Sequence, residues 1–133
     1  MAKKRALVVE DSQTIISVVR YFLQLEGYEV LVAQNGAAGL ELAKNRRPDV
    51  TITDYSMPRM GCMTLVKKLR VDPLTHDIAI LTLTSETGVE KQTHALAVGA
   101  DDYILKPVEP RRLAARVKAA LYRSKIRVPI NSD

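Results

Sequence analysis

The chain has 133 residues, which suits one domain, and 47% hydrophobic with 26% charged residues is ordinary for a globular protein. No apolar run approaches the ~20 residues of a membrane-spanning helix. The basic start is followed by an apolar stretch that ends at Glu10 without a signal cleavage site. The single cysteine, Cys62, excludes an internal disulfide. We therefore expect a cytoplasmic protein without membrane contact.

The net charge of +5 is concentrated at the C-terminal end of the chain. From Arg111 onward there are seven Lys or Arg and one Asp, a net charge of +6, so the other residues sum to −1. A basic helix here could contact nucleic acid or an acidic partner. Because no recognition motif accompanies the charges, we favour a solvated helix face and expect no direct binding of nucleic acid.

Apolar, β-rich runs alternate with helical patterns, which predicts βα units and a parallel sheet. Ser12 is suited to cap the first helix, and Gly27 and Gly99 to end the first and fourth. Pro110 suits the first turn of the last helix. The expected strands are residues 6–9, 29–33, 50–53, 78–83 and 103–105. The expected helices lie around residues 13–26, 36–47, 62–71, 89–98 and 110–124.

This alternation predicts a three-layer, doubly wound α/β fold with right-handed crossovers and one reversal of winding direction. We expect one domain over residues 1–124. Residues 125–133 are expected to be a C-terminal tail or the start of a linker to an effector domain that the sequence does not include.

Polar residues follow four of the expected strands. Glu10 and Asp11 follow the first, Asp54 the third, Thr84 the fourth and Lys106 the fifth. In an open parallel sheet these carboxyl ends share one edge, outside which ligands bind. Three carboxylates, a hydroxyl and a lysine are therefore expected to lie together.

Crowded carboxylates repel one another unless a cation intervenes, and Mg²⁺ suits a site with few protein oxygen ligands. The Lys106 ammonium could hold a phosphoryl oxygen, and Thr84 offers a hydroxyl donor. Asp54, at the centre, would then be a nucleophile that forms an aspartyl phosphate.

Four segments in order, residues 8–12, 54–58, 84–85 and 99–107, resemble the motifs of a known family. Over about residues 5–123 the chain is similar to the receiver domains of two-component response regulators. The resemblance implies a flavodoxin-like five-stranded sheet with strand order 2-1-3-4-5, an order for which the family's chemotaxis member is a standard example. It also implies phosphoryl transfer from a sensor histidine kinase or phosphotransfer protein, with control of a downstream effector.

The resemblance implies roles for individual residues. Asp54 resembles the phosphorylated aspartate and Asp11 a direct Mg²⁺ ligand. Glu10 resembles an acid that holds metal-bound water, and Ser56 the residue whose backbone carbonyl completes the metal site. Lys106 resembles the phosphate-pairing lysine, in a Lys–Pro bond that is commonly cis in the family.

The resemblance further implies that Thr84 and Tyr103 form a switch pair, in which the threonine moves toward the phosphoryl group and the ring turns inward. Residues 99–107 resemble receivers that dimerise through the fourth helix, fifth strand and fifth helix. Asp102 and Arg116 match one family ion pair across the two-fold axis. Gln92 and Arg112 stand where a second pair is expected, so we expect only a weak homodimer on activation.

Three other interpretations of the sequence can be tested against the residues at the site. An aspartate-nucleophile phosphatase needs a second acid two residues after the nucleophile, where this chain has Ser56. A flavin carrier needs a phosphate-binding loop where this chain has two acids at positions 10–11. A degenerate receiver would lack some of the site residues, and all are present. We expect a regulatory phospho-acceptor rather than an enzyme.

One position departs from the family pattern. Cys62 stands eight residues after Asp54, where glycine is usual, and Gly61 precedes it. Either the turn shifts by one residue or Cys62 accepts a strained backbone, and a redox role is a minor alternative. His76 and His94 have no ligand partners in the sequence and are expected at the surface.

Overall fold

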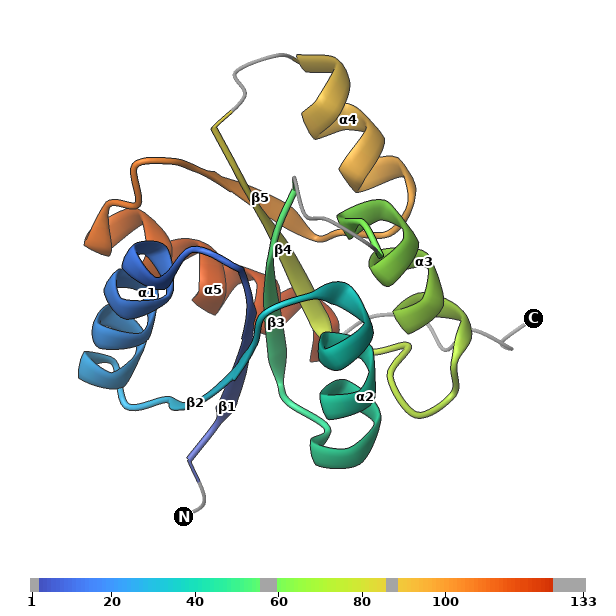
Figure 1. Cartoon of the computed structure of the whole chain (residues 1–133), viewed down its shortest axis with the longest axis horizontal. Coiled ribbons are helices and arrows are strands. Elements are labelled where there is room, and N and C mark those ends of the chain that lie inside the picture. Colours follow the sequence, from blue (N-terminus) through green and yellow to red (C-terminus); the bar gives the residue numbers. More distant parts are fainter. Residues whose placement is uncertain (1–2, 56–59, 86–88, 126–133) are drawn as a thin grey trace.

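The structure is a computed structural model that describes residues 3–55, 60–85 and 89–125, without the side chains of residues 89–92. Strands and helices alternate along the chain, as predicted (Figure 1). The strands described are β1 (Arg5–Val9), β2 (Glu29–Ala33), β3 (Val50–Asp54), β4 (Ala79–Thr84) and β5 (Asp102–Leu105). The helices described are α1 (Gln13–Leu25), α2 (Gly36–Arg46), α3 (Cys62–Val71), α4 (Val89–Ala97) and α5 (Pro110–Lys125).

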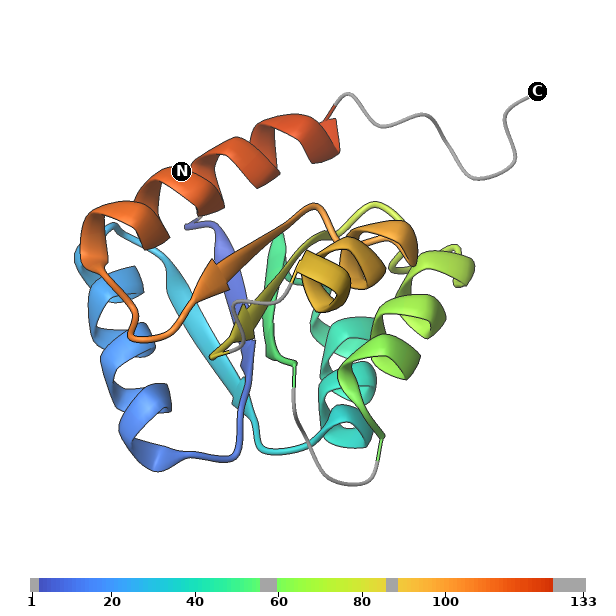
Figure 2. The ribbon, with the colours of Figure 1, turned by 90° about the horizontal axis from the view of Figure 1, so that it is seen from above.

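The strands form one parallel sheet in the order β2-β1-β3-β4-β5, which confirms the predicted fold class. Helices α1 and α5 cover one face of the sheet, and α2, α3 and α4 cover the other (Figure 2). The direction of winding reverses between β1 and β3, so the polar residues that follow these strands lie at the crevice where such sheets bind ligands.

Short-range hydrogen bonds explain where the helices begin. The Ser12 hydroxyl accepts from the N–H of Ile15 at 3.4 Å, and the Asn35 side chain accepts from the N–H of Ala38 at 2.9 Å. Both are N-cap contacts of the kind that satisfies a free N–H group in a first helical turn. The cap predicted for Ser12 is therefore confirmed.

The strand boundaries differ slightly from prediction. β4 begins at Ala79, because the N–H of Ile78 still donates to the carbonyl of Thr75 in the preceding turn. At their other ends β4 and β3 extend to Thr84 and Asp54. These two polar residues are thus held by the sheet itself and not by a loop.

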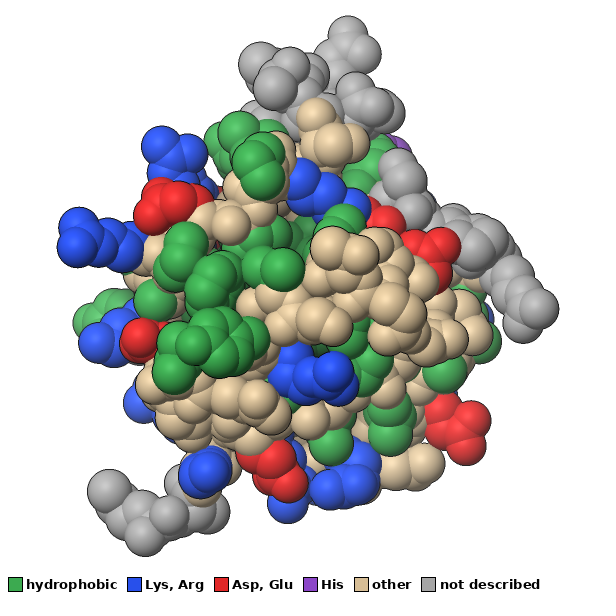
Figure 3. All heavy atoms as spheres, turned by 60° about the vertical axis from the view of Figure 1, so that its left-hand side comes forward, with side chains coloured by type: hydrophobic (Ala, Val, Ile, Leu, Met, Phe, Trp, Pro, Cys, Tyr) green, Lys and Arg blue, Asp and Glu red, His purple; other side chains and the backbone are tan. Residues whose placement is uncertain are grey.

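The surface of α1 is unusually apolar. Val18, Tyr21 and Leu25 are 37%, 59% and 65% exposed, and they share one side of the helix. Hydrophobic side chains gather on the face that carries α1 when this side is turned forward (Figure 3). None of the helices described is long and apolar enough to cross a membrane.

Candidate functional site

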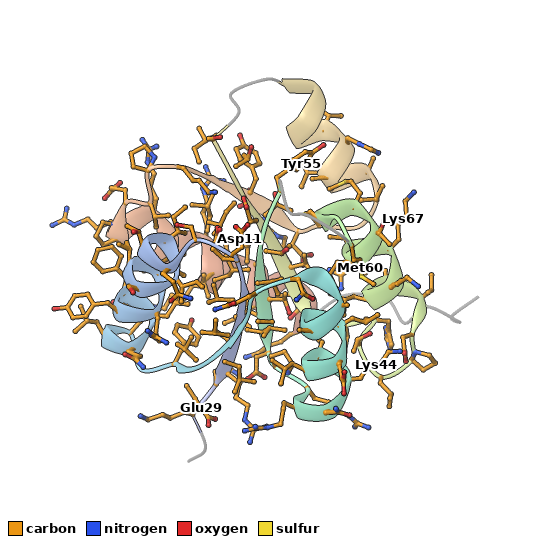
Figure 4. The ribbon with its side chains drawn as sticks, in the orientation of Figure 1. Asp11, Glu29, Lys44, Tyr55, Met60 and Lys67 are labelled. Carbon is orange, nitrogen blue, oxygen red and sulfur yellow. The ribbon has the colours of Figure 1, made fainter. Side chains whose placement is uncertain are left out.

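Three carboxylates meet where β1 and β3 end. Glu10 and Asp11 follow β1, and Asp54 is the last residue of β3, whose Thr53 pairs with Val9 of β1. One oxygen from each of the three carboxylates lies within 4.8 Å of the others. Glu10 and Asp54 are buried while Asp11 is exposed, and Asp11 is labelled near the carboxyl end of β1 in Figure 4. The predicted acidic cluster is present.

The two oxygens of Glu10 have different environments. Oε2 accepts from the backbone N–H groups of Asp11 and Ser12 at 3.1 and 3.0 Å. Oε1 is buried and accepts no hydrogen bond from the described residues. It forms an ion pair with Lys106 Nζ, which lies 3.5 Å away. Burial raises the pKa of Glu10, and the negative charge of Asp54 raises it further. The hydrogen bond from the Ser12 N–H lowers the pKa but does not cancel these effects. A divalent cation would satisfy Oε1 and relieve this repulsion, so the donor set fits Mg²⁺.

Lys106 extends from the end of β5 into the carboxylate cluster. Its backbone N–H donates to the carbonyl of Thr84 at 2.8 Å, and its Nζ donates to Asp54 Oδ1 at 2.9 Å. Partial burial alone would lower the pKa of Lys106, but the hydrogen bond and charge of Asp54, aided by Glu10, outweigh it and the pKa is raised. The ammonium is therefore charged at neutral pH. The Lys106–Pro107 peptide bond is cis, as expected.

Thr84 and Tyr103 lie on neighbouring strands, but they face different surroundings. Thr84 ends β4 and is 3% exposed. Tyr103, on β5, pairs with Thr82 of β4. The guanidinium of Arg116, on α5, lies 5.2 Å from the centre of the Tyr103 ring. The ring thus contacts α5.

The ion pair expected between two chains is made within one chain. Arg116 Nη1 lies 2.7 Å from Asp102 Oδ1. Gln92 belongs to the residues whose side chains are not described, so the expected loss of the second pair is untested. The predicted metal-ligand carbonyl of Ser56 also lies outside the described residues.

Of the two courses expected for Cys62, the structure does not use the strained backbone, because Arg47 is the only described residue other than glycine with a positive φ. Gly61, the N-cap of α3, has an ordinary extended backbone with φ −72°, and Cys62 begins the helix. The thiol is 1% exposed, and burial with the nearby charge of Asp54 raises its pKa to about 12. A neutral, enclosed thiol lacks the properties of a redox-active cysteine. His94 is exposed, as expected, and His76 is half-buried.

The sequence interpretation missed Arg70, in the last turn of α3. Its guanidinium donates to the carbonyls of Gly99, His76 and Ile78 at 2.8, 2.9 and 2.5 Å, and to Asp101 Oδ2 at 3.0 Å. Arg70 thereby joins the end of α3 to the start of β4 and to the connection between α4 and β5. An arginine at a helix end usually suggests a solvated charge, so no local signal indicated this role.

Comparison with known proteins gives the same architecture and a matching family. A family model described as the response regulator receiver domain matches residues 6–118. A putative response regulator from Chloroflexus aurantiacus has a solved structure that is 34% identical, with a TM-score of 0.88. That match covers 92% of this chain and 100% of the other.

Two curated relatives are transcriptional regulatory proteins. The alkaline phosphatase synthesis regulator PhoP of Bacillus subtilis is 37% identical over 95% of this chain and 52% of its own length. The phosphate regulon regulator PhoB of Pseudomonas aeruginosa is 38% identical over 93% of this chain and 54% of its own length. The chain spans about half the length of these relatives. By the family match over residues 6–118 and the agreement of fold, the chain belongs to the response regulator receiver domain family.

Proposed function

We propose that this chain is the phospho-acceptor of a two-component system, in which Asp54 takes a phosphoryl group from a histidine of a sensor kinase or phosphotransfer protein. The observation that carries the proposal is the contact of Lys106 Nζ with Asp54, 2.9 Å away, beside the two further carboxylates of Glu10 and Asp11. A structural ion pair does not need two extra acids at the same place, because they repel one another.

In this proposal an Asp54 oxygen forms a bond to phosphorus as the bond from phosphorus to the donor imidazole breaks. Lys106 then transfers its pairing from the Asp54 carboxylate to an oxygen of the phosphoryl group. The Thr84 hydroxyl, at the end of the adjacent strand, donates to another phosphoryl oxygen. Asp54 is 5% exposed, so an incoming donor reaches it only at this edge of the sheet.

Mg²⁺ would be held by Glu10, Asp11, Asp54 and the Ser56 carbonyl. When bound, it would neutralise charge on the transferring phosphoryl group. The support for this set is the buried Oε1 of Glu10, which accepts no hydrogen bond from the described residues, and the all-oxygen donors around it.

A hollow beside the site supports a protein donor. Thr14, Ile15 and Val18 of α1 line a cavity of about 560 Å³ together with Lys106 and the residues 107–108 that follow it. The lining is largely apolar and reaches Lys106, which contacts Asp54. A donor protein that covers the hollow would bring its phosphohistidine to the acceptor.

The output of this switch is proposed to pass through α4, β5 and α5. The relatives are transcriptional regulatory proteins about twice as long as this chain. We propose that the effector corresponds to the half of these relatives that this chain does not match. Residues 1–124 would then be the receiver domain, and residues 125–133 the start of a linker. Activation would favour a weak homodimer, and the domain would regulate without acting on a separate substrate.

The test is modification of Asp54 by acetyl phosphate, followed by intact mass, and by beryllofluoride, followed by fluorine NMR. We expect modification with Mg²⁺ and little without it. Asp54→Asn should abolish modification, while Asp77→Asn, a change at an exposed carboxylate, should have no effect. Equal modification of wild type and Asp54→Asn would overturn the assignment.

A further inference from the structure

Arg116 makes two contacts at the start of β5. Its Nη1 lies 2.7 Å from Asp102 Oδ1, and its guanidinium carbon lies 5.2 Å from the centre of the Tyr103 ring. The two contacted residues are adjacent in the chain, so one guanidinium bridges a carboxylate and an aromatic face. This geometry combines an ion pair with a cation–π interaction.

A second arginine of α5 supports the same carboxylate. Arg123 Nη2 lies 3.5 Å from Asp102 Oδ2, so Asp102 is held by guanidinium groups from two successive stretches of α5. The side chain of Asp102 is 18% exposed, and that of Arg116 is 39% exposed. The bridge is therefore partly screened from water and attached firmly to one helix.

The ring of Tyr103 lies beside α5 at the sheet edge formed by β5. It lines a small hollow of about 50 Å³ together with Glu109, Arg112 and Arg116. Thr84, in contrast, lies on β4 and is 3% exposed. A ring that turns toward Thr84 must leave the Arg116 guanidinium.

We propose that Arg116 is a positioning residue for Tyr103: its guanidinium holds the ring beside α5 at the edge of the sheet until this contact opens. The inference rests on the proposed role of Tyr103 as part of the switch. It adds that the Asp102–Arg116 pair is used within the free chain, so that a dimer which pairs these residues between chains must first break it. Dimerisation and inward rotation of the ring would then both require the contacts of Asp102 and Arg116 to open.

The expected size of the effect is modest. A partly exposed cation–π contact and a surface ion pair together correspond to roughly a three- to tenfold change in the population of the inward ring. Loss of Arg116 should therefore shift the equilibrium without saturating it.

The test uses a fluorotyrosine incorporated only at position 103 and followed by fluorine NMR. Arg116→Gln should move the resonance of the free protein toward its position with beryllofluoride and Mg²⁺, and Arg116→Lys should restore most of the wild-type shift. Asp102→Asn should act in the same direction as Arg116→Gln. Arg112→Gln is the matched control, since Arg112 lines the same hollow but pairs with Glu109 at 3.5 Å.

A free-protein resonance in Arg116→Gln identical to wild type would overturn the proposal, as would an equal shift in Arg112→Gln. The proposed function is judged separately, by the response of the wild type to beryllofluoride. If the wild type does not respond, the phospho-acceptor role fails. The free-protein spectra still decide whether Arg116 holds the ring, because rotation away from α5 also changes the exposure of the fluorine to water.

Discussion

Aliphatic residues of the three central strands face α1 and α5, whereas threonines occupy much of the opposite face. The first set consists of Ala6, Val8, Val50, Ile52, Ala79, Leu81 and Leu83. The alternate residues of β3 and β4 that point the other way include Thr51, Thr53, Thr82 and Thr84, all at most 3% exposed. Both faces thus carry a hydrophobic core, but the face toward α2, α3 and α4 also buries hydroxyl groups.

The helices on the two faces differ in a similar way. α5 buries Leu113, Val117, Ala120 and Leu121. Among the described side chains of α4, only Ala95 is buried, and Leu96 is 43% exposed. Because stabilisation follows the apolar area buried, α4 is held much more weakly than α5. The comparison teaches that α5, like α3 on the other face, is held to the sheet by four buried side chains, while α4 lies where rearrangement is least costly.

The largest expected effect is a difference in the free energy of unfolding between substitutions on α5 and on α4. Leu113→Ala should lower the free energy of unfolding by about 2–5 kcal/mol, because Leu113 is 1% exposed and the change leaves a cavity. Leu96→Ala on α4 should cost less than about 1 kcal/mol. Urea unfolding of both variants measures the difference, and equal losses would contradict the contrast between the helices.

Arg70 of α3 anchors the connection that follows the weakly packed α4. Arg70→Met should destabilise by about 2–4 kcal/mol, since it leaves the Asp101 carboxylate and several carbonyls without the guanidinium. Lys68→Met, on an exposed position of the same helix, is the control. Hydrogen exchange should show the loss of protection concentrated at the start of β4 and at residues 99–101. Uniform loss across the sheet would argue against a local anchor.

The reactivity of Cys62 tests whether the face of the sheet that carries the buried threonines opens in the folded protein. Its pKa of about 12 means that little thiolate exists at pH 8, and the side chain is buried in the core between the sheet and the helices of this face. Alkylation of the folded protein should be slower than in urea by about a hundredfold or more. Rapid alkylation of the folded protein would mean that this face opens as a whole, and the contrast would then extend beyond α4.

The smallest effect concerns two threonines on the same strand. Thr51 Oγ1 is buried without a hydrogen-bond partner among the described residues, so Thr51→Val should leave stability unchanged or raise it by about 1 kcal/mol. Thr53→Val should be less favourable, because the Thr53 hydroxyl lies 3.4 Å from the Asp54 carbonyl. Thermal unfolding of the two variants measures the difference, and a loss of stability in Thr51→Val would show that its hydroxyl has a partner, such as a buried water.

Much of the fold and the site was predictable from short-range patterns. Each strand and helix has its own apolar period, and Ser12 and Gly99 mark ends that depend on local geometry. The grouping of Asp54 with Glu10 and Lys106 followed from one general property, namely that carboxyl ends of parallel strands share an edge. Of the two alternatives for Cys62, the strained backbone is not used, because Cys62 begins the helix without a positive φ.

By itself, the sequence determined the order of elements, the parallel sheet and the residues at its carboxyl edge, since these depend on the spacing of side chains along a single segment. Only the tertiary structure decided which partners the arginines take. Arg70 reaches carbonyls of two loops, and Arg116 pairs with Asp102 within its own chain while it contacts Tyr103. Long cationic side chains on a helix surface have many neighbours within reach, and the approach of distant backbone segments selects among them.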